Sequence, residues 1–385
     1  MTLTEAPIAK LDSEGNSNLS VSLWQITWRR LFRRKSALVG MGILGFLIFI
    51  ALTAQWLAPY DPYTPLIGIE PVTMRQAPCI HLLGCPADQA QHLMGIDGNG
   101  RDEFSRMLYG ARLSLMIGLS TVSFAIVIGT CLGAIAGYVG GWWDNIIMRV
   151  MDVLLAFPSL LLAIAIVTML GPGLINALLA IGIVSIPSYA RVVRSSVLIV
   201  RETDYVSASK AIGASTVAIL FRHILPNVLT PLIVQGTLGI ATAILDAAAL
   251  SFLGLGAQPP TPEWGSMLGA ERNQVFTAPH LVFYPGLAIM LTVLSFNLLG
   301  DGLRDALDPR LAHASGQSRI SQRSLSFTPH SNPWGVVFPK ALPIFSYSLL
   351  ATIRRSIQQA YAIYPKNCIM FLVLGIKLWK AGFIH

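Results

Sequence analysis

The stretch Asp204–Asn227, DYVSASKAIGASTVAILFRHILPN, lies between two long apolar runs and decides how the rest of the chain is interpreted. Its apolar residues recur at helical spacing, and Gly213 divides it into two short predicted helices. A chain that only has to cross a bilayer does not need a polar helix–glycine–helix element between two spans. The stretch therefore suggests a docking surface for a soluble partner.

The first predicted helix carries Tyr205, Ala208 and Ile212 at positions i, i+3 and i+7, so these side chains share one helical face. Gly213 ends this helix, because glycine permits a sharp turn that other residues resist. Ser215 then stands where its hydroxyl group can cap the next helix.

The second predicted helix repeats the spacing with Val217, Leu220, Phe221 and Ile224 at positions i, i+3, i+4 and i+7. Pro226 is expected to stop this helix, since proline lacks a backbone N–H and its ring clashes with the preceding turn. The next span is then expected to start at a new angle.

The composition is that of a membrane protein. The chain has 385 residues, of which 54% are hydrophobic and 12% are charged, whereas soluble domains contain about 25% charged residues. The apolar residues gather in runs of about twenty, long enough to cross roughly 30 Å of hydrocarbon as helices. We therefore expect an all-α, polytopic protein embedded in the lipid bilayer.

Six runs are suited to span the bilayer as helices. Five cations just before the first run predict a cytoplasmic N-terminus, and alternation then places both chain ends and the stretch 204–227 on the cytoplasmic side. Pro158 and Pro187 interrupt the third and fourth runs and are expected to be kink points. The expected spans are Ala37–Leu57, Leu113–Tyr138, Ile146–Leu170, Leu174–Val193, Val228–Leu253 and Pro285–Gly302.

The segments around the spans divide the chain into parts. Residues 1–36 form a cytoplasmic N-terminal segment that becomes basic, and the first transmembrane helix occupies residues 37–57. Residues 58–110 form an acidic loop expected on the outer face. Residues 111–312 contain the other five spans and the stretch 204–227, and are expected to form the core of the protein.

The end of the outer loop, GRDEFSRMLYGAR at 100–112, has an amphipathic pattern. Its apolar residues share a face opposite Arg101, Glu103 and Arg106, which predicts an interfacial helix that leads into the second span, with these charges turned to solvent. The same loop contains Cys79 and Cys85. Outside the membrane they could form a disulfide or remain two free thiols, and the sequence leaves both open.

The positive charge of the chain is concentrated in its tail. Residues 313–385 hold eight of the 27 Lys and Arg residues and no acid, so the preceding 312 residues hold 19 cations and 19 acids. This distribution argues against a groove for nucleic acid. The tail either lies on the anionic inner leaflet, where basic residues are favourable, or is an accidental extension without a selected role.

The stretch 204–227 resembles the "EAA" segment of binding-protein-dependent ABC importer permeases. That pattern is roughly Glu-Ala-Ala, three residues, Gly, nine residues, Ile, any residue and Leu-Pro. Here Ser207–Ser209 holds the triplet position, Gly213 the glycine and His223–Asn227 the end. The spacing agrees with the pattern, but Ser207 replaces the usual acid and Ser209 the second alanine.

Further strings narrow the resemblance to the peptide/nickel subfamily, and within it to the "C"-type permease of dipeptide and oligopeptide importers. Together the matching strings span about residues 28–312. They are GRDEFSRMLYGARLSL at 100–115, YARVVRSSVL at 189–198, LSFLGLGAQPPTPEWGSML at 250–268 and YPGLAIMLTVLSFNLLGDGLRDALDPRL at 284–311.

The resemblance implies a type I ABC importer permease with six transmembrane helices and cytoplasmic coupling helices, in a bacterial inner membrane. It implies a second homologous permease, two cytoplasmic ABC ATPase subunits and an extracytoplasmic substrate-binding protein as partners. No cofactor is expected on this chain, since ATP and Mg²⁺ belong to the ATPases. The implied ATPase-coupling residues are Tyr205, Ala208, Ile212, Gly213, Ala214, His223, Leu225 and Pro226.

Two acids and one amide are candidates for the translocation path. Asp152 and Asp246 lie in predicted spans, where an acid is costly unless it is paired or hydrated. The alternative for each is a packing contact, for Asp152 with Arg149 or a polar neighbour. Asn297 in the sixth span is the third candidate.

The sequence contains none of the catalytic motifs of an enzyme acting on its own. It has no phosphate-binding loop, no H-E-x-x-H and no G-x-S-x-G, so we expect a transporter subunit. Substrates open within the family are dipeptides, oligopeptides, glutathione-like compounds and nickel complexes. An ATPase-independent secondary transporter and a membrane scaffold are the alternatives from other classes.

Overall fold

The computed structural model describes residues 28–81, 84–86 and 89–307. Within these residues the regular structure is helical, and the only β-type pairings are isolated bridges in the loop that follows the first span. The helices are α2 (Lys35–Leu57), α3 (Glu103–Val139), α4 (Gly141–Leu155), α5 (Ser159–Leu170), α6 (Leu174–Arg201), α7 (Asp204–Ala211), α8 (Thr216–Ile219), η2 (Leu220–Ile224), α9 (Leu225–Phe252), α10 (Trp264–Glu271), η3 (Arg272–Gln274) and α11 (Pro279–Leu307). The predictions for the tail 313–385 lie outside the described residues.

The structure confirms an all-α protein with enough apolar helices for the predicted spans. Within the described part of the chain, five helices are long and apolar enough to cross a membrane, and the pair α4 and α5 makes a sixth if it is counted as one bent span. That pair turns by 92° between Leu155 and Ser159, where Pro158 immediately precedes α5. The kink predicted at Pro158 is therefore present, and it changes the chain direction far more than a usual proline kink.

A stripe of glycines brings α3 against α6. Gly129, Gly133 and Gly137 recur every fourth residue, so they share one face of α3. A Cβ atom on any of them would lie within 3 Å of α6 atoms, such as the carbonyl oxygen of Ala190 beside Gly133. Small residues permit this close approach of two backbones, which is how helices in membranes gain packing contacts.

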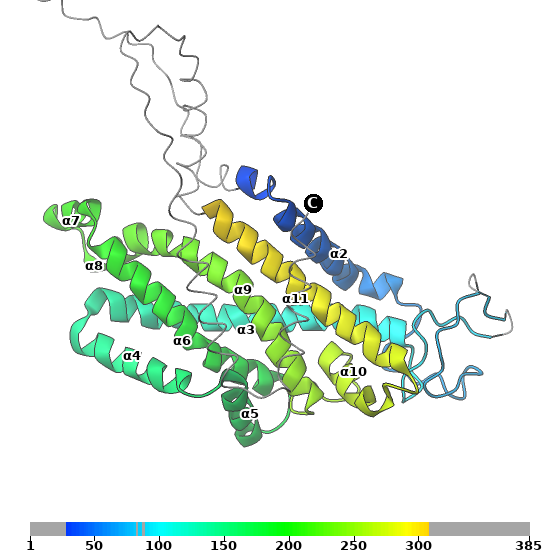
Figure 1. Cartoon of the computed structure of the whole chain (residues 1–385). Helices are drawn as coiled ribbons and strands as arrows, with labels where there is room; N and C mark the ends of the chain where they lie inside the picture. The colour runs from blue at the N-terminus through cyan, green and yellow to red at the C-terminus, as the bar shows by residue number, and fades with distance from the viewer. Residues whose placement is uncertain (1–27, 82–83, 87–88, 308–385) are drawn as a thin grey trace, which may run out of the picture. The chain divides into compact units, whose positions relative to one another are not determined.

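The helices α2, α11 and α9 lie side by side (Figure 1). Gly40 and Gly302 allow α2 and α11 to approach each other closely, since a Cβ at Gly302 would meet Ala37. The outward side of α2 exposes apolar side chains, including Phe46 and Leu52. This arrangement fits a helix with one face on protein and one face on lipid.

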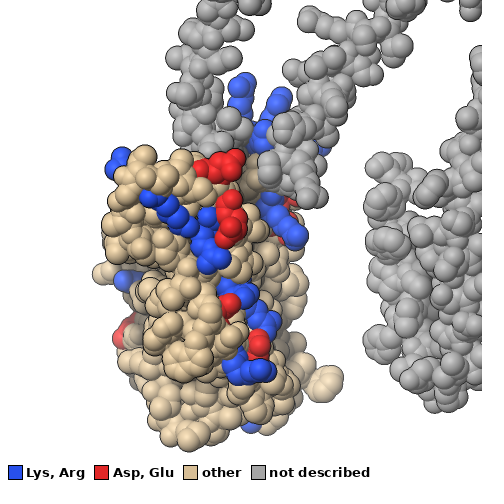
Figure 2. Space-filling model, turned by 90° about the vertical axis from the view of Figure 1, so that its left-hand side faces the viewer, with Lys and Arg blue, Asp and Glu red and all other residues tan. Residues whose placement is uncertain are grey.

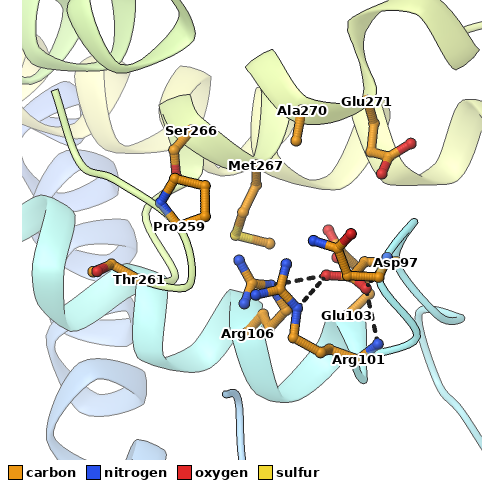
Figure 3. Close-up of a pocket in the computed structure, with 11 residues that line it drawn as sticks. Asp97, Arg101, Glu103, Arg106, Pro259, Thr261, Ser266, Met267, Ala270 and Glu271 are labelled. Carbon is orange, nitrogen blue, oxygen red and sulfur yellow. Dashed lines mark hydrogen bonds and ion pairs between the residues drawn. The ribbon is translucent and has the colours of Figure 1, made fainter. Parts of the chain in front are cut away.

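Charged residues fasten the loop after α2 to the start of α3. Arg101 Nε lies 2.8 Å and Arg106 Nε 3.4 Å from the Asp97 carboxylate, and all three side chains are buried. Figure 3 shows Arg101 and Arg106 pointing at Asp97 below Met267 of α10. These residues line a cavity of about 40 Å³.

The helix predicted at 100–112 is confirmed in one respect and wrong in another. It leads into the second span, since its residues from Glu103 onward are the first turns of α3. Arg101, Glu103 and Arg106, predicted to face solvent, are buried. For the two arginines the reason is pairing, since both lie against the Asp97 carboxylate. Asp102 caps the helix by accepting a hydrogen bond from the Ser105 N–H.

Further contacts hold together the region formed by residues 58–102 and α10, which is called the cap below. A disulfide joins Cys79 to Cys85, which decides between the two alternatives left open by the sequence. The buried His92 lies between Asp102, at 2.9 Å, and Glu70, at 3.4 Å. Burial and the nearby Glu70 carboxylate raise the pKa of Tyr60, whose ring packs against His92.

The segment 258–271 ends in the helix α10, and Glu263 caps the N-terminus of that helix. Glu263 accepts hydrogen bonds from the N–H groups of Gly265 and Ser266 at the start of α10. Burial raises the pKa of Glu263, and these N–H groups act in the opposite direction. Trp264 is buried, and its ring N–H donates to the Met107 carbonyl oxygen at 3.2 Å.

Candidate functional site

The stretch 204–227 forms two helices with a glycine turn between them, at one end of the helical bundle (Figure 1). Gly213 has a φ of +83°, a conformation that glycine adopts without strain and other residues resist. Ser215 caps α8, since its hydroxyl oxygen accepts a hydrogen bond from the Ala218 N–H at 3.3 Å. The turn and the cap agree with the sequence prediction.

Polar contacts join the two helices. The ring of Tyr205 lies 6.1 Å from the ring of His223, and the Tyr205 hydroxyl accepts a hydrogen bond from the Asn227 amide at 3.1 Å. Ser209, at the triplet position, lies 3.5 Å from His223 through its hydroxyl oxygen. The residues around the glycine turn therefore form one unit, in which Tyr205 and His223 meet.

Some of the apolar side chains of this unit point away from the protein. Ile212 is 85% exposed, and Val217 and Phe221 are each 64% exposed. Tyr205 and Ala208 are also exposed, whereas Ala214 and Leu225 are half-buried.

The unit is anchored by Val206, Ile219 and Ile224, which are buried. The predicted apolar face is therefore divided: Ile224 is turned inward, while Val217 and Phe221 are turned outward. The outward side chains form a surface suited to another protein.

Pro226 does not stop the second helix, so the prediction made for it is wrong. The chain runs as one helical stretch from Thr216 to Phe252. The turn η2 before the proline is a π-helix, in which the Leu225 N–H bonds to the Leu220 carbonyl oxygen, five residues back. This wider turn accommodates the proline ring, which would clash in an ordinary α-turn.

Asp152 is paired with an arginine of the neighbouring helix. Its carboxylate lies 2.6 Å from Arg191 on α6, and the two side chains are 54% and 52% exposed. One and two turns closer to the start of α4, Arg149 and Asp144 line the same cavity of about 440 Å³. Arg194 bonds the Asp144 carboxylate through two of its nitrogens.

Figure 2 looks onto the end where α7 and the α3–α4 turn lie, and shows Lys, Arg, Asp and Glu side chains in a band on that face.

The prediction considered Arg149 as the partner of Asp152, whereas the structure gives that role to Arg191. Opposite charges on two successive spans were a sequence signal that could have found this pairing.

The other two path candidates, Asp246 and Asn297, do not line the cavity beside Asp152. Asp246 lies half-buried on α9, and Asn297 lies half-buried on α11. Among the described residues, no hydrogen bond, ion pair or cavity joins Asp152, Asp246 and Asn297. The structure therefore does not gather the three into one site.

The fold and this site define a class of protein: a polytopic, all-helical membrane protein with a two-helix unit at one end that exposes apolar side chains. Comparison with known families makes the assignment specific. Residues 129–313 match the binding-protein-dependent transport system inner membrane component, and residues 22–78 match the N-terminal TM domain of oligopeptide transport permease C.

Curated relatives cover most of the chain. It is 50% identical over 292 residues to the dipeptide transport system permease protein DppC of Alkalihalophilus pseudofirmus, an alignment that covers 76% of this chain and 91% of that protein. It is 47% identical over 288 residues to the glutathione transport system permease protein GsiD of Escherichia coli, covering 75% of this chain and 91% of that protein. The chain belongs to the family of binding-protein-dependent ABC transport permeases.

A more distant likeness is found among solved structures. An inward-facing structure of the MetNI methionine ABC transporter aligns with 53% of this chain and 96% of that chain, at 19% identity and a TM-score of 0.44.

Proposed function

We propose that this protein is the permease subunit of an ATP-driven importer that carries peptides across the bacterial inner membrane. The observation that carries the proposal is the unit formed by α7, α8 and η2, which exposes Ile212, Val217 and Phe221 beside a glycine turn. A relative of this chain at 50% identity is named a dipeptide permease. Both observations favour a subunit that works with a separate energy source.

The proposed orientation places the α7 end in the cytoplasm, together with both chain termini. Arg194, Arg201, Lys210 and Arg222 lie at this end, as the positive-inside rule expects. Two ATPase subunits would bind the exposed side chains of 204–227 and supply the ATP and Mg²⁺ chemistry. The cap built from 58–102 and α10 would then face the outside and the substrate-binding protein.

The translocation path would form between this subunit and a second, homologous permease. Asp152, Asp246 and Asn297 are the residues proposed for it. Asp152 supports the proposal because it and Arg191 are half exposed on a helix pair of the apolar bundle, a placement that calls for water or a partner. Asp152 would line the wall of the path. Because Arg191 pairs with it, its carboxylate would carry no uncompensated charge there.

The substrate is proposed to be a dipeptide or oligopeptide. The 47% identical glutathione permease keeps a glutathione-type substrate as the second candidate, and nickel complexes remain a third. Purified binding protein from the same system, titrated with dipeptides, glutathione and Ni²⁺, would decide among them.

Reconstituted transport tests the proposal as a whole. The complete transporter, in vesicles with ATP inside and loaded binding protein outside, is expected to accumulate labelled dipeptide only when ATP is hydrolysed. The control is the same complex carrying an ATPase variant that binds ATP without hydrolysing it. Uptake that continues with that variant, or without any ATPase subunit, would refute the proposal and favour a secondary transporter.

A further inference from the structure

Three polar side chains share one face of α9. Gln235, Thr242 and Asp246 fall at i, i+7 and i+11, which places them within about 40° of one another at roughly 100° per residue. Thr242 is exposed, and Gln235 and Asp246 are half-buried. These three residues are called the polar face of α9 below.

C-terminal to Thr242, the exposed side chains of α9 are apolar. Leu245 and Phe252 are exposed as well, but they lie about 100° or more around the helix from Asp246. The helix therefore presents an apolar edge suited to lipid and a polar edge that is not. An ionisable side chain at membrane depth is expensive in contact with lipid and faces a water-filled cavity or a protein partner instead.

Asp246 differs from Asp152 in whether a cation pairs with its carboxylate. Asp152 is neutralised by Arg191 at 2.6 Å. Asp246 forms no hydrogen bond or ion pair with any residue in the part of the chain that the structure describes. Of these two acids, Asp246 is the one with a carboxylate free to attract a passing cation.

We propose that the polar face of α9 is a binding track for a protonated amine, with Asp246 as its anionic site. The inference rests on the proposed function and adds to it the charged group of the substrate that the membrane-embedded path recognises. An ammonium group has three donors and no acceptor, and the carboxylate, hydroxyl and amide oxygens of this face are all acceptors.

The spacing of the three residues suits a path more than a single tight site. Eleven residues of helix rise about 17 Å, so Gln235, Thr242 and Asp246 offer acceptors at successive depths. A substrate with a free amine would be drawn to Asp246 and would leave through weaker, neutral contacts. The track would favour peptides with a free amino terminus over the same peptides with a blocked one.

Cysteine labelling tests whether the polar face borders water. Cys131, which is exposed on α3, and Cys368 are first replaced by serine, and Gln235→Cys, Thr242→Cys and Asp246→Cys are then introduced singly into the full transporter. A charged, membrane-impermeant maleimide is expected to label all three and to label them more slowly when peptide-loaded binding protein and ATP are present. Leu245→Cys, one residue away on the apolar edge, is the matched control and is expected to resist this reagent.

Transport kinetics test the role of the charge. Asp246→Asn is expected to lower the uptake rate of a free-amine dipeptide about tenfold, which corresponds to about 1.4 kcal/mol. Asp246→Glu, which keeps the charge, is expected to restore most of the rate. ATP hydrolysis stimulated by loaded binding protein is expected to persist in Asp246→Asn, because the coupling unit is untouched.

The outcomes separate this inference from the proposed function. Unlabelled cysteines at all three positions, together with unchanged uptake by Asp246→Asn, would overturn the track while ATP-driven import still stood. Loss of the second permease from purified Asp246→Asn complexes would also overturn it, since Asp246 would then pair with that subunit. Absence of ATP-driven uptake in the wild-type complex would instead sink the proposed function.

Discussion

The two ends of the molecule treat charged and apolar side chains in opposite ways. At the cap of 58–102 and α10, Arg101 and Arg106 are buried and both pair with the buried Asp97. In the unit 204–227, Ile212 and Phe221 are apolar and exposed. The cap therefore buries charged side chains against one another, whereas the unit leaves apolar side chains exposed.

Because of this difference, substitutions in the cap are expected to change stability, and substitutions in the unit are expected to change function. Removing one partner of a buried ion pair leaves a charge without compensation and destabilises the fold. Removing an exposed apolar side chain costs the isolated protein little, but it removes contact area from a complex. Substitutions in the cap are therefore expected to show in a melting assay, and substitutions in the unit in a binding or uptake assay.

The largest effect is expected at the glycine turn. Gly213→Arg should abolish uptake while the protein remains in the membrane, because arginine at a φ of +83° distorts the turn that the partner surface is built on. Uptake and membrane content are measured together. Gly68→Arg is the control: Gly68 also has a positive φ, +86°, and open space around it, and this variant should still bind the ATPases. Normal transport by Gly213→Arg would remove the coupling role from this stretch.

A smaller effect, on stability, is expected at the cap. Asp97→Asn should destabilise the protein by about 3–5 kcal/mol, since Arg101 and Arg106 would lose the carboxylate they share. Thermal melting of the purified protein in detergent measures the change. Asp61→Asn, in an exposed position of the same loop, should shift the melting temperature far less. Equal shifts for the two variants would contradict the contrast drawn between buried and exposed charge.

A still smaller effect, on partner affinity, is expected at the exposed unit. Phe221→Ala should weaken ATPase binding by about 2 kcal/mol, or roughly 30-fold, as for an aromatic residue in the centre of an interface. Its melting temperature should stay near the wild-type value. Phe276→Ala is matched to it, because Phe276 is 98% exposed near the cap and should leave ATPase affinity unchanged. If both variants bind the ATPases normally, the exposed apolar surface is not the contact.

The smallest effect is expected for the tail. Truncation after Leu311 removes residues 312–385 and should leave uptake unchanged, as for an extension without a selected role. Uptake is compared at equal amounts of membrane-inserted protein. A clear decrease would instead support a role for the basic tail, such as binding to anionic lipid.

Much of the fold could be predicted from local pattern. The length of each apolar run indicated the spans, and the first predicted span, 37–57, differs from α2 by two residues at its start. The glycine turn and the Ser215 cap were also predicted, because each depends on one residue and its immediate neighbours. The 92° turn between α4 and α5 exceeds what the presence of Pro158 implied, since the angle depends on packing around the break.

The errors arose where distant residues decide the outcome. Arg101 and Arg106 were placed in solvent because their position on the helix suggested an outer face, while their burial depends on Asp97 and on the covering helix α10. Arg75 is held by Glu271, which is 196 residues away in the sequence. Pro226 was expected to stop a helix, and the wider turn of η2 that accommodates it has no simple sequence signal.

The unbroken run from Thr216 to Phe252 has a mechanical consequence. Its 37 residues give a helical path about 55 Å long, with a π-turn before Pro226 and a second proline, Pro231, inside α9. Moving as one body about a pivot near its midpoint, by about 10°, it would sweep each end through up to about 5 Å, in opposite directions. Motion imposed on Phe221 would then shift Asp246 the other way without a relay of intermediate contacts.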